Sequence, residues 1–226
     1  MILIKDIHMD KIDVIYFINL DRRTDRLQQI MGEFVKMEIP LEKIIRITAI
    51  DEKIGILGCT KSHCVAIDHF VKSGKQLCLI LEDDFEFTET KEKVNEVLGN
   101  IFSTKTTIDC LLLGGSDNSV MSTSNPYLTK IFFAVQACAY ILPKHFAPSL
   151  LHTWNEAARK QEKWIQAFGE PENAFNNDYY WVYSQVASHY YYTTPKLGKQ
   201  RDSPSDISGT SKVTMIHVTP DKIEKT

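Results

Sequence analysis

Residues 77–84 read LCLILEDD, a run of five apolar residues followed by three carboxylates. A short and continuously apolar run is typical of a strand that is buried on both faces of a parallel sheet. Two more such runs occur at residues 14–18 and 108–113, and helical patterns lie between the runs. This alternation predicts an α/β protein with a mostly parallel central sheet flanked by helices, in which ligands gather at the carboxyl ends of the strands.

The spacing of apolar residues places the other expected elements. A first helix is expected after Thr24, a suitable N-cap, because five apolar residues recur there at helical spacing: Leu27, Ile30, Met31, Phe34 and Val35. Further helices are expected at residues 60–73, 94–101, 148–160 and 178–188, with Gly74 ending the first of these, and strands are expected at residues 44–50 and within 132–142. Beyond Pro195 the chain is polar, and we expect a loop that could close over a ligand.

The composition is that of an ordinary globular protein. Its 226 residues are 43% hydrophobic and 24% charged, which suits a single domain over residues 1–226 with a core at about 14–207. The formal net charge of -3 gives no reason to expect a nucleic-acid partner. Charged residues interrupt residues 1–11, and no apolar run reaches about 18 residues, so neither a secretory signal nor a transmembrane segment is expected. The expected location is cytoplasmic.

The five cysteines show no metal-binding spacing. Several of them lie within apolar runs, so they are expected to be reduced core residues. Cys59 and Cys64 do not form a CxxC pair, and no second pair accompanies them, so a structural zinc site is not expected.

The carboxylates of the acidic cluster Glu82-Asp83-Asp84 would repel one another strongly unless a cation or basic groups neutralised them. Carboxylate oxygens suit Mn²⁺ or Mg²⁺, and these ions commonly bind substrate phosphates as well. Alternate residues of an extended segment face the same side, so Glu82 and Asp84 can act together. We expect Asp84 to bind the metal directly, with Glu82 or Asp83 assisting; a solvated strand end is the alternative.

The cluster also begins a second motif. Residues 84–88 read DFEFT, which resembles the DxDxT motif of haloacid dehalogenase-type phosphatases, in which the first Asp attacks phosphorus. Glu86 replaces the second Asp of that motif, and the motif lies deep in the chain rather than on its first strand. Both departures weaken the phosphatase interpretation.

Several segments match, in order, the blocks of one enzyme family. Residues 18–26 (INLDRRTDR) resemble its opening block, residues 58–63 (GCTKSH) its second block and residues 79–84 (LILEDD) its acidic strand. Residues 139–142 and, more loosely, 195–207 resemble its later strand and closing loop. In these segments the chain resembles glycosyltransferase family 25, which includes lipooligosaccharide galactosyltransferases and collagen hydroxylysine galactosyltransferases.

The resemblance implies a GT-A-type fold and a UDP-sugar donor. It further implies inverting transfer of a hexose, galactose more often than glucose, to a glycan, a lipooligosaccharide or a hydroxylysine-type acceptor. A chain that kept the fold without turnover would instead be a non-catalytic nucleotide-sugar-binding protein.

The same resemblance assigns donor-binding roles near the first strand and the second block. The candidates are Asn19, Asp21, Arg22, Arg26, Ser62, His63, Glu82 and Asp83. Arg22 or Arg26 could hold phosphate through a bidentate fork, although exposed arginines often form only surface ion pairs. Ser62 and His63 are expected at a helix start, where backbone amides can meet an anion; a capping serine and a packed histidine are the alternative.

Three further assignments concern the second half of the chain. Asp178, before an aromatic segment, is the candidate catalytic base, and a helix cap is the alternative. His217 could be a late metal ligand, although a lone histidine in an apolar strand is more often a core residue. Lys196, Lys199 and Arg201 could neutralise the diphosphate if the closing segment folded over it.

Overall fold

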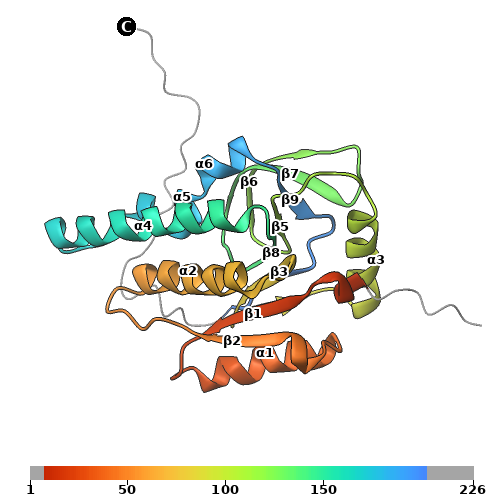
Figure 1. Ribbon diagram of the computed structural model, residues 1–226, viewed down its shortest axis with the longest axis horizontal. Helices are drawn as coiled ribbons and strands as arrows, with labels where there is room; N and C mark the ends of the chain where they lie inside the picture. Colours follow the sequence, from red (N-terminus) through yellow and green to blue (C-terminus); the bar gives the residue numbers. More distant parts are fainter. Residues whose placement is uncertain (1–7, 203–226) are drawn as a thin grey trace, which may run out of the picture.

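A computed structural model describes residues 8–202 and is built around an eight-stranded sheet (Figure 1). The strands of this sheet are β1 (Val14–Asn19), β2 (Ile44–Thr48), β3 (Leu77–Glu82), β5 (Cys110–Leu112), β6 (Ser116–Ser122), β7 (Leu128–Val135), β8 (Ala139–Pro143) and β9 (Tyr190–Thr193). Their spatial order is β2-β1-β3-β8-β5-β9-β7-β6. The apolar runs quoted above therefore became β1, β3 and β5 at the centre of the sheet.

Most strands of the sheet run in the same direction, although neighbouring strands form both parallel and antiparallel pairs. β1 pairs in parallel with β2 and β3, and β5 pairs in parallel with β9. The other four pairings, β3 with β8, β5 with β8, β7 with β9 and β6 with β7, are antiparallel. Only β7 and β8 thus run against the other six strands, so the predicted α/β class with a mostly parallel sheet is confirmed.

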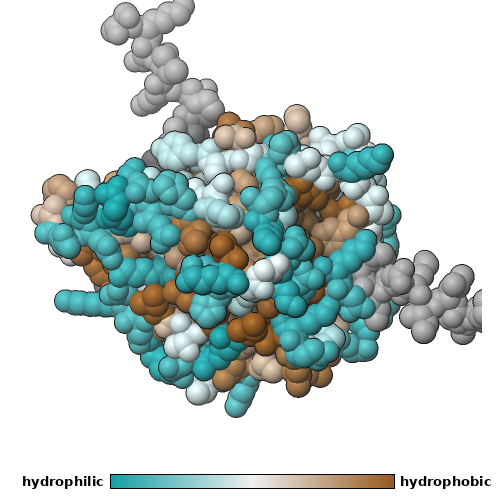
Figure 2. Space-filling model, viewed as in Figure 1, coloured by the Kyte–Doolittle hydropathy of each residue, from teal (hydrophilic) through white to brown (hydrophobic). Residues whose placement is uncertain are grey.

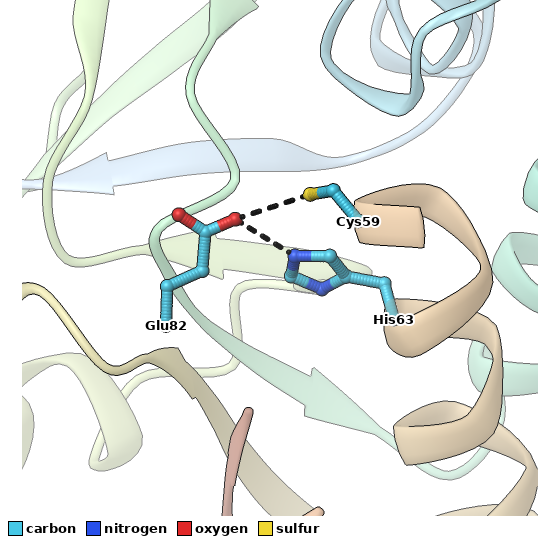
Figure 3. A group of neighbouring side chains, drawn as sticks. All are labelled: Cys59, His63 and Glu82. Atoms are coloured by element: carbon cyan, nitrogen blue, oxygen red, sulfur yellow. Dashed lines mark hydrogen bonds and ion pairs between the residues drawn. The ribbon is translucent and has the colours of Figure 1, made fainter. Parts of the chain in front are cut away.

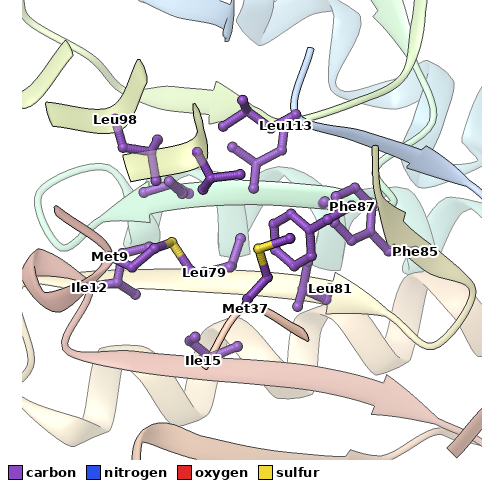
Figure 4. Close-up of a cluster of buried hydrophobic side chains, with 14 of the residues drawn as sticks. Met9, Ile12, Ile15, Met37, Leu79, Leu81, Phe85, Phe87, Leu98 and Leu113 are labelled. Carbon is purple, nitrogen blue, oxygen red and sulfur yellow. The ribbon is translucent and has the colours of Figure 1, made fainter. Parts of the chain in front are cut away.

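Alternate residues of the central strands serve two hydrophobic cores. Ile15 and Phe17 join the core beneath α1 (Thr24–Lys36) and α3 (Lys91–Phe102), part of which Figure 4 shows. Val14, Tyr16 and Ile18 join the core beneath α2 (Gly55–Ser73) and α4 (Ala147–Phe168), which lie side by side in Figure 1. Successive side chains of a strand point to opposite faces of the sheet, and helices cover both faces here. Both sets of side chains are therefore buried, which explains why the runs are continuously apolar.

The predicted helices exist, but several of their ends were wrong. α1 has Arg23 as its N-cap rather than Thr24, and Val35 is 73% exposed because the buried stripe includes Arg26 and Glu33 instead. α2 begins at Gly55, five residues earlier than expected, and ends at Gly74 in the left-handed conformation as predicted. α4 continues to residue 168, and the expected helix at 178–188 is two short helices, α5 (Asn177–Tyr180) and α6 (Val182–Ala187).

Several short elements were not expected from the sequence. β4 (Phe85–Phe87) pairs antiparallel with β10 (Gly198–Gln200), so part of the expected polar loop beyond Pro195 is a strand. Three 3₁₀ helices span His8–Lys11, Leu41–Lys43 and Asn173–Phe175. The β4–β10 pair matters for the site because it carries the chain on to Gln200, beside the acidic cluster.

Hydrophilic residues cover most of the face shown in Figure 2, and hydrophobic residues appear there in separate patches. The exposed large hydrophobic residues belong to different elements, among them Val35 in α1, Met121 in β6 and Phe168 in α4. Within residues 8–202, no helix is both long enough and apolar enough to cross a membrane.

Candidate active site

A cleft opens at the carboxyl ends of β1, β2 and β3, where the sequence predicted ligands to gather. The first turns of α2 form its other wall, and it holds about 680 Å³ of space, counting the part open to solvent. Its polar lining consists of Arg22, Arg26, Asp51, Glu52, Cys59, Ser62, His63, Glu82, Asp83, Asp84 and Gln200.

One buried arginine holds two of the three clustered carboxylates. Arg26 Nη1 lies 3.1 Å from Asp83 Oδ1 and 3.0 Å from Asp84 Oδ2, and all three side chains are less than a tenth exposed. Asn19 Nδ2 donates to Asp83 Oδ2 at 2.7 Å. Arg26 and Asn19 therefore each bind one oxygen of the Asp83 carboxylate. Because the single positive charge of Arg26 is shared among several carboxylates, the cluster keeps a net negative charge.

Asp84 is the carboxylate with unused binding capacity. Its Oδ2 accepts a hydrogen bond from Gln200 Nε2 at 3.1 Å, whereas its Oδ1 is buried and has no hydrogen-bond partner among the described residues. Burial and the neighbouring charge of Glu82 raise the pKa of Asp84 to about 7. A buried carboxylate oxygen without a donor, next to a second carboxylate, is a fitting ligand set for Mn²⁺ or Mg²⁺.

Glu82 faces α2 across the cleft (Figure 3). Its Oε1 lies 3.1 Å from His63 Nε2 and accepts from Cys59 Sγ at 3.5 Å. His63 is fully buried, and its Nδ1 lies 3.0 Å from the hydroxyl of Tyr140. Burial alone would raise the pKa of Glu82, but the hydrogen bond and charge of His63 outweigh it and lower that pKa below its ordinary value.

Asp178 comes close to Glu82 from the second half of the chain, although it is not among the residues that line the cleft. Its Oδ1 accepts from the Ala137 backbone N–H at 2.8 Å, and Gln136, which precedes Ala137, has a φ of 73°. Burial and the charge of Glu82 raise the pKa of Asp178 to about 6. The helix cap is Asn176, whose side chain accepts from the Asp178 backbone, so the cap interpretation of Asp178 was wrong.

The expectation that Ser62 and His63 lie at a helix start was also wrong. Both lie about two turns into α2, because that helix begins at Gly55. Ser62 Oγ donates to the Gly58 carbonyl at 2.6 Å and accepts from the Ile50 backbone N–H at 2.8 Å. At this depth the backbone amides already serve helical hydrogen bonds, so they are not available to an anion.

Of the candidate residues at and after the first strand, some line the cleft and others only hold neighbouring side chains in place. Arg22 lines the cleft, where it is ion-paired with Asp51. Asn19 and Asp21 do not line it: Asn19 is buried, and both side chains are bonded to Arg46. Asn19 therefore holds Asp83 in position instead of lining the cleft. His217, the other candidate metal ligand, lies outside the described residues.

The basic residues of the closing segment do not face the cleft. Arg201 is ion-paired with Glu33 and Glu86, Lys199 lies 3.4 Å from Glu86, and Lys196 Nζ donates to the Gly115 carbonyl at 2.6 Å. The expectation that they neutralise a diphosphate is not met in this arrangement. Gln200 contacts the Asp84 carboxylate through its side chain, and the Arg201 backbone N–H donates to the Asp84 carbonyl at 2.7 Å.

Several residues of the site were missed in the sequence, among them Cys59 and Asn177. Cys59 lies in the cleft and is not a core residue, and its signal was the four-residue spacing to His63, which puts both on one helix face. Asn177 is 2% exposed, and its Oδ1 lies 3.9 Å from Cys59 Sγ. No local pattern marks Asn177, because 118 residues separate it from Cys59.

The contact between β10 and β4 leads to a stability prediction. A Cβ on Gly198 would overlap the ring of Phe85, which is fully buried, and would lie 2.5 Å from the Glu86 carbonyl oxygen. We expect Gly198→Ala to loosen β10 and the Gln200 contact with Asp84, and to cost about 1–3 kcal/mol of unfolding free energy. Thermal denaturation measures this loss.

The matched control is Gly32→Ala in α1. A Cβ there would meet nothing within 4 Å, and alanine is the better helix former, so the melting temperature is expected to hold or rise. Equal melting temperatures for the two variants would contradict the close approach of β10 to β4.

Comparison with known proteins finds no family model that matches this sequence and no curated protein that matches it. Among solved structures, mannose-1-phosphate geranyltransferase from Thermus thermophilus is similar at 10% identity and a TM-score of 0.49, over 84% of this chain and 74% of that one. A glycosyltransferase involved in the glycosylation of the major capsid of PBCV-1 is similar at 8% identity and a TM-score of 0.47, over 85% of this chain and 93% of that one. Similarity at this level assigns neither a family nor an activity.

Proposed function

We propose that this protein is a metal-dependent glycosyltransferase that uses a nucleotide diphosphate sugar, a UDP-hexose by its resemblance to glycosyltransferase family 25. The observation that carries the proposal is the buried Oδ1 of Asp84, which has no hydrogen-bond partner within residues 8–202 and lies beside Glu82 in a cleft at the carboxyl ends of three parallel strands. An oxygen site with excess negative charge calls for a cation, and a cleft at this edge of an α/β sheet is where nucleotides commonly bind.

Asp84 would hold Mn²⁺ or Mg²⁺, with Glu82 assisting. When bound, the ion would supply Lewis-acid stabilisation of the charge that develops on the leaving diphosphate. Arg22 lines the same cleft and is about half exposed, so it can exchange its Asp51 partner for a phosphate oxygen. Arg26 has a different task, because it is buried and holds Asp83 and Asp84 in place.

Asp178 would act as the base in an inverting transfer. Its carboxylate is held through Oδ1 by the Ala137 backbone, and a pKa near 6 leaves it largely ionised at neutral pH. An ionised carboxylate can take the proton of an acceptor hydroxyl as that hydroxyl attacks the anomeric carbon. The acceptor class we propose is a glycan, a lipooligosaccharide or a hydroxylysine-type residue, reached in the cytoplasm.

The geometry does not favour the phosphatase alternative. In that mechanism the acid two residues after the nucleophile must act at the same phosphate. Here Glu86 does not line the cleft and is ion-paired with Lys199 and Arg201 on the β4–β10 side. Glu86 is therefore not placed to assist Asp84 at a phosphate bound in the cleft.

A donor screen tests the proposed function. Purified protein is incubated with Mn²⁺ and UDP-galactose, UDP-glucose or their N-acetylated forms, and UDP release is followed by mass spectrometry. We expect slow hydrolysis of at least one UDP-hexose, a loss of this activity with a chelator, and its recovery when Mn²⁺ is restored.

Calorimetry separates the alternatives. Donor binding without turnover on any acceptor would indicate a nucleotide-sugar-binding protein, and cleavage of a generic phosphomonoester would indicate the phosphatase. Absence of binding to every UDP-sugar in the presence of Mn²⁺ would contradict the proposal.

A further inference from the structure

Three potential metal ligands of different chemistry, two from α2 and one from the end of β3, meet in the cleft. Cys59 and His63 project from α2 toward Glu82, which ends β3 (Figure 3). Glu82 Oε1 lies 3.5 Å from Cys59 Sγ and 3.1 Å from His63 Nε2, and all the potential ligand atoms lie within 4.8 Å of one another. Ligand atoms around a tetrahedral Zn²⁺ are about 3.4 Å apart, given metal–ligand bonds of about 2.0–2.3 Å. The two distances to Glu82 thus match the spacing of a tetrahedral ligand set, and the separation of the Cys59 and His63 ligand atoms is at most 4.8 Å.

The histidine is oriented as a metal ligand would be. His63 is fully buried, and its ring packs against Trp154 and Tyr140 at centroid distances of 5.2 and 5.8 Å. With Nε2 on a metal, Nδ1 carries the proton and can donate to the Tyr140 hydroxyl 3.0 Å away. Such a bond from the distal nitrogen fixes the tautomer and the ring orientation of ligating histidines.

A buried polar group beside the cysteine also has no partner in the part of the chain that the structure describes. Asn177 is 2% exposed and accepts hydrogen bonds through Oδ1 from Thr60 and, at 3.9 Å, from Cys59. Its Nδ2 is buried and has no hydrogen-bond partner among the described residues. Since an unmade hydrogen bond of this kind is costly, an acceptor bound next to Asn177 would satisfy it.

We propose that Cys59, His63 and Glu82 form a binding site for a divalent transition-metal ion of the Zn²⁺ class, next to the oxygen site at Asp84 and sharing Glu82 with it. Thiolate and imidazole ligands favour Zn²⁺ or Co²⁺ over Mg²⁺ and Mn²⁺, which prefer oxygen. Three protein ligands leave a fourth position open, and all three line the cleft, so a water or a substrate atom can occupy it. The thiol proton leaves on binding, and the positive charge of the ion stabilises the thiolate, which burial and the charges of Glu82, Asp178 and Asp84 otherwise disfavour.

Cobalt spectroscopy tests the site without any donor or activity. The reduced, chelator-treated full chain is titrated with Co²⁺ while near-ultraviolet and visible absorbance are recorded. We expect a thiolate-to-cobalt charge-transfer band together with visible bands of tetrahedral Co²⁺, both of which Zn²⁺ displaces. Absence of the charge-transfer band at saturating Co²⁺ would overturn the proposal.

Variants assign the ligands. Cys59→Ser is expected to remove the charge-transfer band, and His63→Gln to weaken Co²⁺ binding at least about tenfold. The matched control, Cys64→Ser, changes a buried cysteine of the same helix outside the cluster and should keep the band. Asp84→Asn should also keep it, which separates this site from the proposed donor metal.

Two measurements complete the test. Circular dichroism and thermal melts establish that each variant is folded. A band that survives in folded Cys59→Ser protein would assign the sulfur ligand elsewhere and would overturn the site. The outcome is independent of the donor screen, because neither sugar nor turnover is measured.

Discussion

Asp84→Asn is expected to lower metal-dependent UDP-hexose turnover by at least about a hundredfold and, at the same time, to stabilise the metal-free protein. The amide keeps the size of the side chain and its contact with Gln200, but it removes the charge that a cation would neutralise. Removal of one group that stabilises the charge developing in the transition state typically lowers the turnover rate by a factor of this size. Donor binding in the presence of Mn²⁺ is expected to weaken in parallel.

The stability gain follows from the raised pKa of Asp84. Because the folded pKa is about 7 and the ordinary value is 3.8, the folded state binds the proton more tightly than the unfolded state. Wild-type stability therefore falls as the pH rises from about 4 to about 7, by up to about 4 kcal/mol. At pH 8 the variant should melt several degrees above the metal-free wild type.

The control for this prediction is Asp21→Asn. Asp21 is exposed, does not line the cleft and is ion-paired with Arg46, so the change should leave turnover and stability nearly unaltered. A pH series of thermal melts and a donor assay measure both effects. Full turnover in Asp84→Asn protein would refute the assigned role of this carboxylate.

Asp178→Asn is expected to reduce kcat by about 10²–10⁴ while leaving donor affinity within a few fold of the wild type. The amide oxygen can still accept from the Ala137 backbone, so the local structure should persist. The base must be ionised to take a proton, and burial and Glu82 put its pKa at about 6. Wild-type kcat should therefore rise with pH through about 6 and then level off, whereas the residual activity of the variant should lack this step.

Asn176→Ala separates catalysis from helix capping. Asn176 caps α5 through its side chain, and its loss should cost about 1 kcal/mol of stability with a smaller effect on kcat. The readouts are a pH–rate profile, calorimetric donor affinity and a thermal melt. An unchanged pH profile in Asp178→Asn protein would place the base elsewhere.

The central strands could be predicted because their burial is written locally. β1 and β3 are apolar at every position that faces either core. The pattern that identifies each strand therefore lies entirely within consecutive residues. β4 and β10 were missed because three residues are too few for a periodic signal, and their pairing joins positions more than 110 residues apart in the sequence. The polar composition beyond Pro195 indicated a loop, but pairing with β4 overrode that local preference.

Within the site, the sequence by itself determined the acidic cluster and its position at the end of β3, because an apolar run followed by carboxylates is a contiguous pattern. It did not determine which carboxylate is satisfied, because Arg26 and Asn19 approach Asp83 from other elements. Only the tertiary structure leaves Asp84 Oδ1 without a partner among the described residues, and only it brings Asp178 and Cys59 beside Glu82. The physical reason is that hydrogen-bond satisfaction and pKa depend on neighbours in space, which the fold selects from distant parts of the chain.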